Sequence, residues 1–307
     1  MNTRREFLTG AVAGMCAAGG KFTLSGAEKE SGKMKFGFCT WNVEMTKTGK
    51  DVGYDFIEMT VGAALGPDKD GEWWKRRRDE LAAMALPLRS CNGFIPGSFR
   101  LTGPKADHEP ALKYAEIAMR RAAEAGVNTL VFGSGGARNV PGDYCAADRK
   151  DWPDVQKGRD QYVDFCRELC RRTADLGEKT CVVVEPLCPN ESNIVNFVWQ
   201  GVQICEEVAS PRLKELADLY HMMAGHESAE SIVKAGALLK HCHIAEFGTR
   251  QYPGCDEKLN AKYEPYFAAL KKIGYTGGVS CECGWGDGKE LGKKLETALA
   301  TMKAFSH

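Results

Sequence analysis

The fold of this chain is decided by the stretch Thr180-Cys181-Val182-Val183-Val184-Glu185-Pro186, which continues to Glu191. Four β-prone residues in a row predict a strand that is buried on both faces, as the strands of a parallel sheet are. The strand must stop at Pro186, because proline has no N–H to donate to a neighbouring strand. An apolar strand that ends in a carboxylate indicates that Glu185 has a cation or a proton to hold.

One transition from helix to strand recurs along the chain. A helical segment ends at glycine, the usual residue just past a helix end, where φ is positive, and a strand follows shortly. Such transitions begin at Gly53, Gly126, Gly177, Gly236 and Gly274. The predicted strands cover residues 34–40, 54–59, 88–94, 128–133, 179–185, 214–218, 239–244 and 278–282.

Apolar residues at helical spacing predict helices between these strands, over residues 109–125, 155–176, 192–207, 228–235, 263–273 and 289–305. Eight strands that alternate with helices over about 275 residues favour a closed (β/α)8 TIM barrel. No Gly-x-Gly-x-x-Gly motif follows the first strand, which disfavours a dinucleotide-binding fold. Only about 13 residues separate the first two strands, so we expect a shortened first βα unit, with a single turn or an irregular link.

Residues 1–30 are predicted to be an export signal, followed by a single catalytic domain over residues 31–307. Arg4 and Arg5 precede a weakly apolar run that is too short to anchor the chain in a bilayer. The pattern resembles a twin-arginine signal, so we expect a periplasmic or other extracytoplasmic protein without a stable membrane span in its mature form. The alternative is a chance arginine pair at a disordered terminus.

The composition argues against nucleic acid and anionic membranes as partners. Lys and Arg together number 41, as do Asp and Glu, so the chain carries no global field that would attract them. Apolar residues make up 43% of the sequence, which is enough for a large core. The 13 cysteines show no repeated pair spacing, so we expect buried free thiols that behave as small hydrophobic side chains.

The polar residues that end the predicted strands indicate a metal site. In a TIM barrel the active site lies at these C-terminal ends. Strands five to eight contribute three carboxylates and one imidazole, from Glu185, Asp218, His243 and Glu282. This donor set suits Mn²⁺, Mg²⁺ or Co²⁺ better than a thiolate-loving metal. Without a cation the three carboxylates would repel one another, and at least one would have to protonate.

Four ordered motifs resemble those of the xylose-isomerase-like superfamily of sugar isomerases and epimerases, nearest to D-tagatose/D-psicose 3-epimerases and hydroxypyruvate isomerase. The motifs are Glu185-Pro186-Leu187-Cys188-Pro189-Asn190-Glu191, Ala217-Asp218-Leu219-Tyr220-His221-Met222, His241-Cys242-His243-Ile244-Ala245-Glu246 and Cys281-Glu282. The resemblance covers about residues 34–305. It is specific for the fold and the metal site, and much less so for the substrate.

The resemblance implies a role for each matching residue. It assigns the metal to Glu185, Asp218, His243 and Glu282, with Mn²⁺ as the first choice and Mg²⁺, Co²⁺ or Zn²⁺ as alternatives. Glu185 and Glu282 match the acid/base pair. Substrate contacts fall on Glu191, His221 and Arg250, although Arg250 lies one position later after His243 than the family places its arginine. A shortened first unit would also alter the rim near Trp41, where the family places an apolar wall against the sugar.

The implied activity is that of a divalent-metal-dependent epimerase or isomerase of a small ketose or keto-sugar, acting through a cis-enediolate. Its partner is a small sugar, and a homo-oligomer is compatible with the sequence. Alternatives are a 3-keto-glycoside lyase or hydrolase, and an inactive exported sugar-binding barrel. An endonuclease of the endonuclease IV type would need more histidines than the six present, and a basic face.

Three other strand-end residues are expected to stand outside the metal site. His241 lies two positions before His243 and is interpreted as a structural neighbour. Glu246 is interpreted as a partner within its loop. Glu58 ends the second strand, and we expect no direct contact between it and the substrate.

Overall fold

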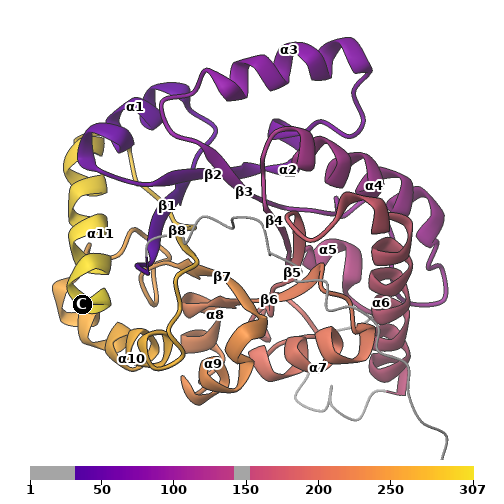
Figure 1. Ribbon diagram of the computed structural model, residues 1–307. Coiled ribbons are helices and arrows are strands. Elements are labelled where there is room, and N and C mark those ends of the chain that lie inside the picture. The colour runs from indigo at the N-terminus through magenta and orange to yellow at the C-terminus, as the bar shows by residue number, and fades with distance from the viewer. Residues whose placement is uncertain (1–31, 142–152) are drawn as a thin grey trace, which may run out of the picture. The chain divides into compact units, whose positions relative to one another are not determined.

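Eight parallel strands within the described residues close into a barrel in chain order, and β8 pairs with β1 (Figure 1). The computed structural model describes residues 32–141 and 153–307, so the predicted export signal over residues 1–30 lies outside the described residues. The strands are β1 (Lys35–Cys39), β2 (Phe56–Thr60), β3 (Leu88–Asn92), β4 (Thr129–Phe132), β5 (Cys181–Val184), β6 (Leu213–Asp218), β7 (Leu239–Ile244) and β8 (Gly278–Cys281). The predicted TIM barrel is confirmed.

Helices form a ring around the barrel (Figure 1). The longer ones are α1 (Val43–Val52), α3 (Gly71–Ala82), α4 (His108–Glu124), α6 (Pro153–Arg172), α7 (Val198–Val208), α10 (Glu264–Lys272) and α11 (Leu291–Ser306). Shorter turns are α2 (Val61–Ala64), α5 (Gly135–Arg138), η2 (Ala174–Leu176), α8 (Leu219–Ala224), α9 (Glu230–Ala235), η3 (Gly236–Leu238) and η4 (Glu257–Tyr263). Leu112, Ala115, Met119 and Ala122 of α4 are buried, as their helical spacing predicted.

The glycines that were predicted to separate helices from strands do so. Positive φ angles occur at Gly53 (101°), Gly126 (75°), Gly177 (69°), Gly236 (50°) and Gly274 (64°). An L-residue other than glycine rarely adopts this conformation, so these positions fix where each chain reversal begins.

The first βα unit is short, but the expected single turn or irregular link is wrong. A ten-residue helix, α1, spans the gap. The Asn42 side chain accepts hydrogen bonds from the backbone N–H groups of Glu44 and Met45, which caps the start of the helix. Gly53 in the left-handed conformation ends it, and β2 begins only at Phe56. Because both of its ends are capped tightly, a ten-residue helix fits into the short link between β1 and β2. The spacing of the predicted strands had left room for a single turn only.

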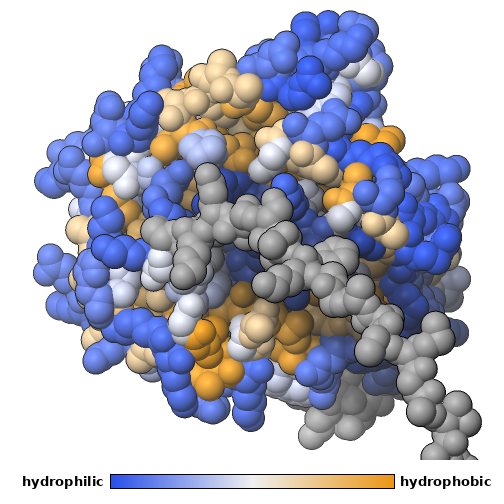
Figure 2. All heavy atoms as spheres, in the orientation of Figure 1, coloured by the Kyte–Doolittle hydropathy of each residue, from blue (hydrophilic) through white to orange (hydrophobic). Residues whose placement is uncertain are grey.

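Two further helices differ from the sequence prediction. Helix α3 was not predicted, because its Arg-rich sequence has little apolar periodicity; Figure 2 shows hydrophilic side chains over it. Helix α7 begins at Val198 and not at residue 192. Between β5 and α7 the chain forms an irregular loop in which Val195 has a φ of 54°. Gln200 Oε1 accepts from the backbone N–H of Asn196 (2.6 Å), so the chain enters the helix only there.

Inside the barrel, apolar side chains lie toward the N-terminal ends of the strands, and polar side chains lie at their C-terminal ends. Phe56 occupies space that Gly37 and Gly278 leave open, since a Cβ on either glycine would crowd its ring. Val131, Val183 and Leu216 form a separate apolar cluster. Side chains alternate along a strand, so Val183 and Leu216 lie one layer below Glu185 and Asp218 and support them.

The described cysteines are free, as predicted, and most are buried; Cys255 is exposed, and Cys39 and Cys283 are half-buried. Among the described residues, no helix has both the length and the apolar character needed to cross a membrane.

Candidate active site

Four side chains from adjacent strands converge at the C-terminal end of the barrel. Glu185 follows β5, Asp218 ends β6, His243 lies in β7 and Glu282 follows β8. One ligand atom from each lies within 4.8 Å of the others. The strand register causes this convergence: Asp218 pairs with His243, and Ile244 with Cys281, so the side chains leave the barrel at the same level. The structure thus brings together the whole predicted metal set.

His243 lies at the centre of this group. Its Nδ1 is 2.9 Å from Glu185 Oε1, 3.6 Å from Glu282 Oε2 and 3.9 Å from Asp218 Oδ2. The ring is fully buried. Burial alone would lower the pKa of His243, but the charges of Glu58 and Glu282 and the carboxylate hydrogen bonds outweigh it and raise the pKa.

Glu58 holds the other side of the His243 ring, a role that the sequence analysis missed. Its Oε1 is 2.9 Å from His243 Nε2, and its Oε2 is 2.9 Å from His241 Nε2. Ser90 Oγ donates to the same Oε2 at 2.6 Å. Burial would raise the pKa of Glu58, yet the two imidazoles lower it well below its usual value. The carboxylate can therefore hold the His243 proton on Nε2, which leaves Nδ1 facing the three acids.

The carboxylates at the rim are held in defined positions. Glu282 Oε1 accepts from Asn92 Nδ2 at 2.9 Å, and Glu282 Oε2 accepts from Arg250 at 3.0 Å. Asp218 Oδ1 accepts from the backbone N–H groups of Tyr220 and His221. Glu185 lies against Gly133, where any Cβ would collide with its carboxylate. The glycine-rich loop after β4 therefore makes room for this acid.

The raised pKa of Glu282 shows that the neighbouring carboxylates repel one another. Burial, followed by the charges of Glu185 and Asp218, raises its pKa to about 7, although His243 and Arg250 act in the opposite direction. A divalent cation among three carboxylates and one imidazole would remove this repulsion. The donor chemistry and the spacing therefore fit a divalent metal ion, which Glu185, Asp218, His243 and Glu282 would hold.

The predicted substrate residues gather on the β5–β7 side of the metal set. Arg250 donates to Glu191 Oε1 (2.9 Å) and to Glu282, and its guanidinium lies 4.8 Å from the centre of the Tyr220 ring. The Cys188 backbone N–H donates to His221 Nδ1 at 3.2 Å. His221 Nε2 is buried, has no hydrogen-bond partner among the described residues, and lies 3.7 Å from Asp218 Oδ2. This nitrogen is therefore available for a hydrogen bond with a polar atom of a ligand.

The charge of His221 is set by its neighbours. Burial would lower its pKa, but the charge of Asp218, a hydrogen bond with the Cys188 thiol and the nearby glutamates raise it to about 9. Arg250 adopts a φ of 54°, which suits the tight turn that carries it over the site, one position later than the family pattern. The shift in sequence therefore leaves Arg250 within reach of the metal set.

Glu246 lies apart from this set. Its carboxylate accepts from the backbone N–H of Thr249 at 3.1 Å and also contacts the Thr249 hydroxyl. Its backbone N–H donates to Gln251 O at 2.8 Å. Glu246 thus shapes the loop that carries Arg250, in agreement with its interpretation as a loop partner.

The sequence and the fold are matched by known proteins. The family described as xylose isomerase-like TIM barrel matches residues 47–305. The chain belongs to this family. An L-ribulose 3-epimerase from Methylomonas sp. is 30% identical over 154 residues, which cover 50% of this chain and 52% of that protein. A D-psicose 3-epimerase from Agrobacterium fabrum is 31% identical over 139 residues, covering 43% and 46%.

These matches span about half the length of the curated relatives. A solved structure of D-psicose 3-epimerase with D-tagatose, from Clostridium cellulolyticum H10, aligns with a TM-score of 0.73 at 20% identity and covers 89% of this chain and 100% of that one. At this identity, the likeness shows a shared fold.

In this family member a pocket of about 440 Å³ adjoins the metal set on the side opposite Glu191. It lies between the ends of β1, β2 and β8, and Glu58, Asn92 and Glu282 line its floor. The pocket therefore starts at Glu282, one of the two glutamates that the family resemblance assigns to acid/base chemistry, and extends away from the metal set.

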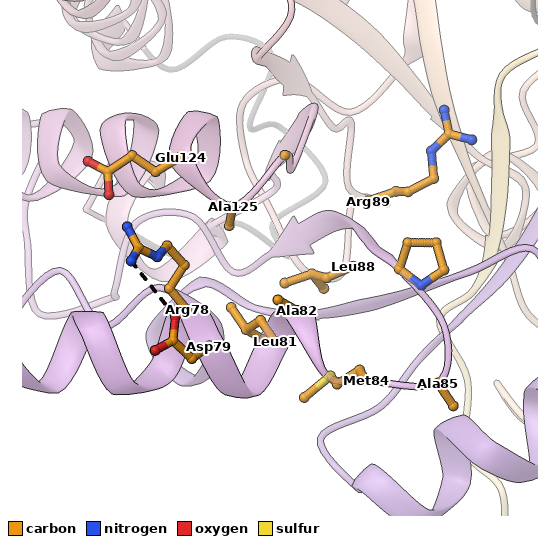
Figure 3. A pocket seen from close by; sticks show the side chains of 12 residues that line it. Arg78, Asp79, Leu81, Ala82, Met84, Ala85, Leu88, Arg89, Glu124 and Ala125 are labelled. Atoms are coloured by element: carbon orange, nitrogen blue, oxygen red, sulfur yellow. Dashed lines mark ion pairs between the residues drawn. The ribbon is translucent and has the colours of Figure 1, made fainter.

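Another hollow, of about 630 Å³, lies at the opposite end of β3, between α3 and the end of α4 (Figure 3). Its polar groups are already partnered. Arg78 pairs with Asp79 (3.8 Å), and Glu124 accepts from the Trp74 indole N–H at 2.7 Å. These described charged groups of the hollow have partners, so we assign no chemistry to it.

Proposed function

We propose that this protein is a divalent-metal-dependent epimerase or isomerase of a small unphosphorylated ketose or keto-sugar. One observation carries the proposal: Glu185 and Glu282, from different strands, converge on the same nitrogen of a buried histidine. Two carboxylates that approach one centre from different strands are suited to exchange a proton at a carbon held between them. The relatives named as 3-epimerases of L-ribulose and D-psicose support epimerisation at C3.

The four predicted ligands would hold the metal, with Mn²⁺ favoured by three hard oxygen donors and one imidazole. When bound, a divalent cation polarises the carbonyl of a ketose and makes the adjacent C–H more acidic. His243 presents Nδ1 to the acids because Glu58 holds its Nε2. The chain thus prepares the donor set through its own hydrogen bonds.

Proton transfer belongs to the two glutamates. One carboxylate removes the proton next to the carbonyl and gives an enediolate, and the other returns a proton to the opposite face of the same carbon. Asn92 and Arg250 fix Glu282, while Glu185 is packed against Gly133. Because both acids are held by neighbours, neither needs to reorganise as the reaction proceeds.

The polar residues on the β5–β7 side would orient the sugar. His221 Nε2 and Glu191 are available for hydroxyl groups, and Arg250 can contact the sugar from above. Arg250 is already paired with Glu191 and Glu282, so it offers little uncompensated positive charge for a phosphate. This balance supports a neutral substrate.

The test is hydrogen exchange at carbon. The Mn²⁺-loaded protein is incubated in D₂O with free ketopentoses and ketohexoses, and NMR locates the deuterium. We expect deuterium at C3 with the parent, and a loss of at least about 100-fold with Glu185→Gln and with Glu282→Gln. Glu206→Gln, at an exposed position on α7, is the matched control.

Two outcomes would contradict the proposal. Binding of a ketose without any C–H exchange would favour the inactive sugar-binding barrel. Release of a leaving group from a keto-glycoside added to the same incubation, with no epimer formed, would favour the lyase or hydrolase.

A further inference from the structure

The pocket beside Glu282 is walled by aromatic and aliphatic side chains. Its walls include Trp41, Met45, Trp285 and Leu291. Trp285 is held in place by Tyr252, whose ring stacks on it at 5.8 Å, and by Phe38, which meets it edge-on at 6.3 Å. The pocket therefore presents a fixed apolar surface that continues outward from the reacting centre.

Trp41 stands at the mouth of this pocket with 84% of its surface exposed. Its backbone is fixed on both sides: Thr40 Oγ1 accepts from the Asn42 backbone N–H at 3.0 Å, and Asn42 caps α1. An exposed indole contributes little to folding, since its area stays in water. An exposed aromatic ring on a fixed backbone, at the mouth of a pocket, is suited to stack on a ligand.

Two neutral polar groups of the pocket have free hydrogen-bonding capacity. Asn92 Oδ1 and Trp285 Nε1 are buried and have no hydrogen-bond partner among the described residues. No lysine or arginine is among the described residues that line the pocket, whereas Glu58 and Glu282 are. A phosphate would meet carboxylates and no cation there, so the pocket suits a neutral, hydroxyl-rich group.

The size of the pocket exceeds what the end of a free ketose chain needs. Pockets of about 300–1,000 Å³ usually enclose drug-sized ligands, and this one has about 440 Å³ in addition to the polar side at Glu191. A ketose whose reacting carbons lie between Glu185 and Glu282 would extend only a few atoms into it. Most of the pocket, and the exposed ring of Trp41 at its mouth, would then have room for a further group.

We propose that this pocket is a subsite for a second, neutral sugar ring. The substrate is then a ketose or keto-sugar that carries a glycosyl group on the end remote from its carbonyl, with that ring stacked on Trp41. The inference rests on the proposed function for the reacting end of the substrate. It goes further in naming a glycosylated ketose as the substrate class.

The test compares three ketoses that differ only at O6. These are D-fructose, isomaltulose (D-fructose with a glucosyl group on O6) and D-fructose 6-phosphate, each with the Mn²⁺-loaded parent in D₂O. We expect kcat/KM for exchange to be about tenfold higher with isomaltulose than with D-fructose, and lowest with the phosphate. Trp41→Ala should lower the ratio of the isomaltulose and D-fructose values about tenfold, mainly through the KM for isomaltulose.

Trp199→Ala is the matched control. Trp199 is 44% exposed, stacks on Phe197 and does not line the pocket, so both kcat/KM values should stay as in the parent. Equal values for isomaltulose and D-fructose would overturn the subsite and leave the epimerase intact. So would a Trp41→Ala variant with the parent's substrate ratio.

A measurement of binding tests the subsite independently of turnover. Saturation-transfer NMR with isomaltulose should show magnetisation reaching the glucosyl protons in the parent, and much less in Trp41→Ala. Absence of transfer to the glucosyl ring in the parent overturns the subsite. Absence of exchange with all three ketoses, despite transfer to the ring, overturns the proposed reaction and supports the subsite.

Discussion

Glu58 is the residue whose substitution should most directly weaken metal binding without removing a predicted ligand. In Glu58→Gln, the amide can no longer accept from both His241 and His243, so the His243 tautomer and ring position lose their restraint. Residues that orient a metal-binding histidine typically contribute 10- to 100-fold to affinity. We therefore expect the Kd for Mn²⁺ to rise by about that factor, measured by titration calorimetry on the metal-free protein.

Ser90→Ala supplies the control for this prediction. It removes one of the three hydrogen bonds to Glu58 and leaves both imidazole contacts, so its effect on Kd should be several-fold smaller. An unchanged Kd in Glu58→Gln, with the fold intact by circular dichroism, would show that His243 is positioned by other contacts.

Glu215 is a second buried acid, outside the metal set, and it predicts a pH-dependent stability. Neither of its oxygens has a hydrogen-bond partner among the described residues, and Gly201 of α7 packs directly on it. Burial, and then the charge of Glu227, raise the pKa of Glu215 well above its usual value. The folded state therefore binds this proton more tightly than the unfolded state, and its stabilising effect is lost as pH rises through the folded-state pKa.

Glu215→Gln should consequently stabilise the protein at high pH only. We expect it to exceed the parent by about 1–3 kcal/mol in free energy of unfolding at pH 8, and to match it near pH 4, below the ordinary glutamate pKa of about 4.3, where the carboxyl is protonated in both states. Urea denaturation at both pH values provides the measurement. Glu206→Gln, exposed on the same helix, should show no such difference, and a parallel shift in both variants would refute the argument.

The rim residues and Glu58 differ in how far the sequence reveals them. Glu185, Asp218 and His243 could be predicted because each ends a strong strand, and the rule that barrel sites lie at strand ends then groups them. Glu58 also ends a strand, but its role depends on which residues face it across the barrel. His241 is 183 positions away in the chain, and no local pattern records that contact.

At the scale of elements, Arg138 ties three segments together. It is fully buried at the end of α5 and donates to the carbonyl oxygens of Phe132 (2.9 Å), Glu185 (2.8 Å) and Val195 (3.3 Å). These carbonyls belong to the end of β4, the end of β5 and the loop before α7. The planar guanidinium can reach all three, whereas a lysine ammonium is a compact point charge that cannot.

Arg138→Lys should therefore destabilise the protein by about 2–3 kcal/mol, the usual scale for losing hydrogen bonds to a buried charged group. Hydrogen exchange should increase most in residues 186–197, the loop that carries Glu191. Arg171→Lys, exposed on α6, is the matched control. Uniform exchange across the barrel in Arg138→Lys would show that this arginine contributes to overall stability but does not hold the loop.

The same loop shows why element boundaries were harder to predict than elements. The residues from 192 onward are compatible with a helix, but Val195 adopts a positive φ, and α7 begins only after Gln200 and Glu227 have bonded the free N–H groups at its start. Glu227 comes from 29 residues further along the chain, so a sequence window cannot include it. In contrast, Gly53 and Asn42 act locally, and their capping signals were in the sequence although the helix between them was not predicted.

At the scale of the whole molecule, the closed barrel could be predicted from eight alternating strands, because few other arrangements bury that many parallel strands. The pocket beside Glu282 could not. It is built from the ends of β1, β2 and β8, which come from opposite ends of the chain and meet only when the barrel closes. Closure thus creates both the site and the space beside it.

Closure would also make a metal ion held by the four rim residues a link across strands β5 to β8, so its removal should loosen the whole barrel. A ligand that binds only the folded state contributes about 2.7 kcal/mol at 100 times its Kd, which corresponds to a shift in Tm of about 5 °C for a domain of this size. We expect EDTA to lower the Tm of the Mn²⁺-loaded protein by that amount, and added Mn²⁺ to restore it. Asp218→Asn, which loses a charged donor, should show a smaller shift. An unchanged Tm, together with no metal by elemental analysis of the purified protein, would show that the three carboxylates coexist without a cation.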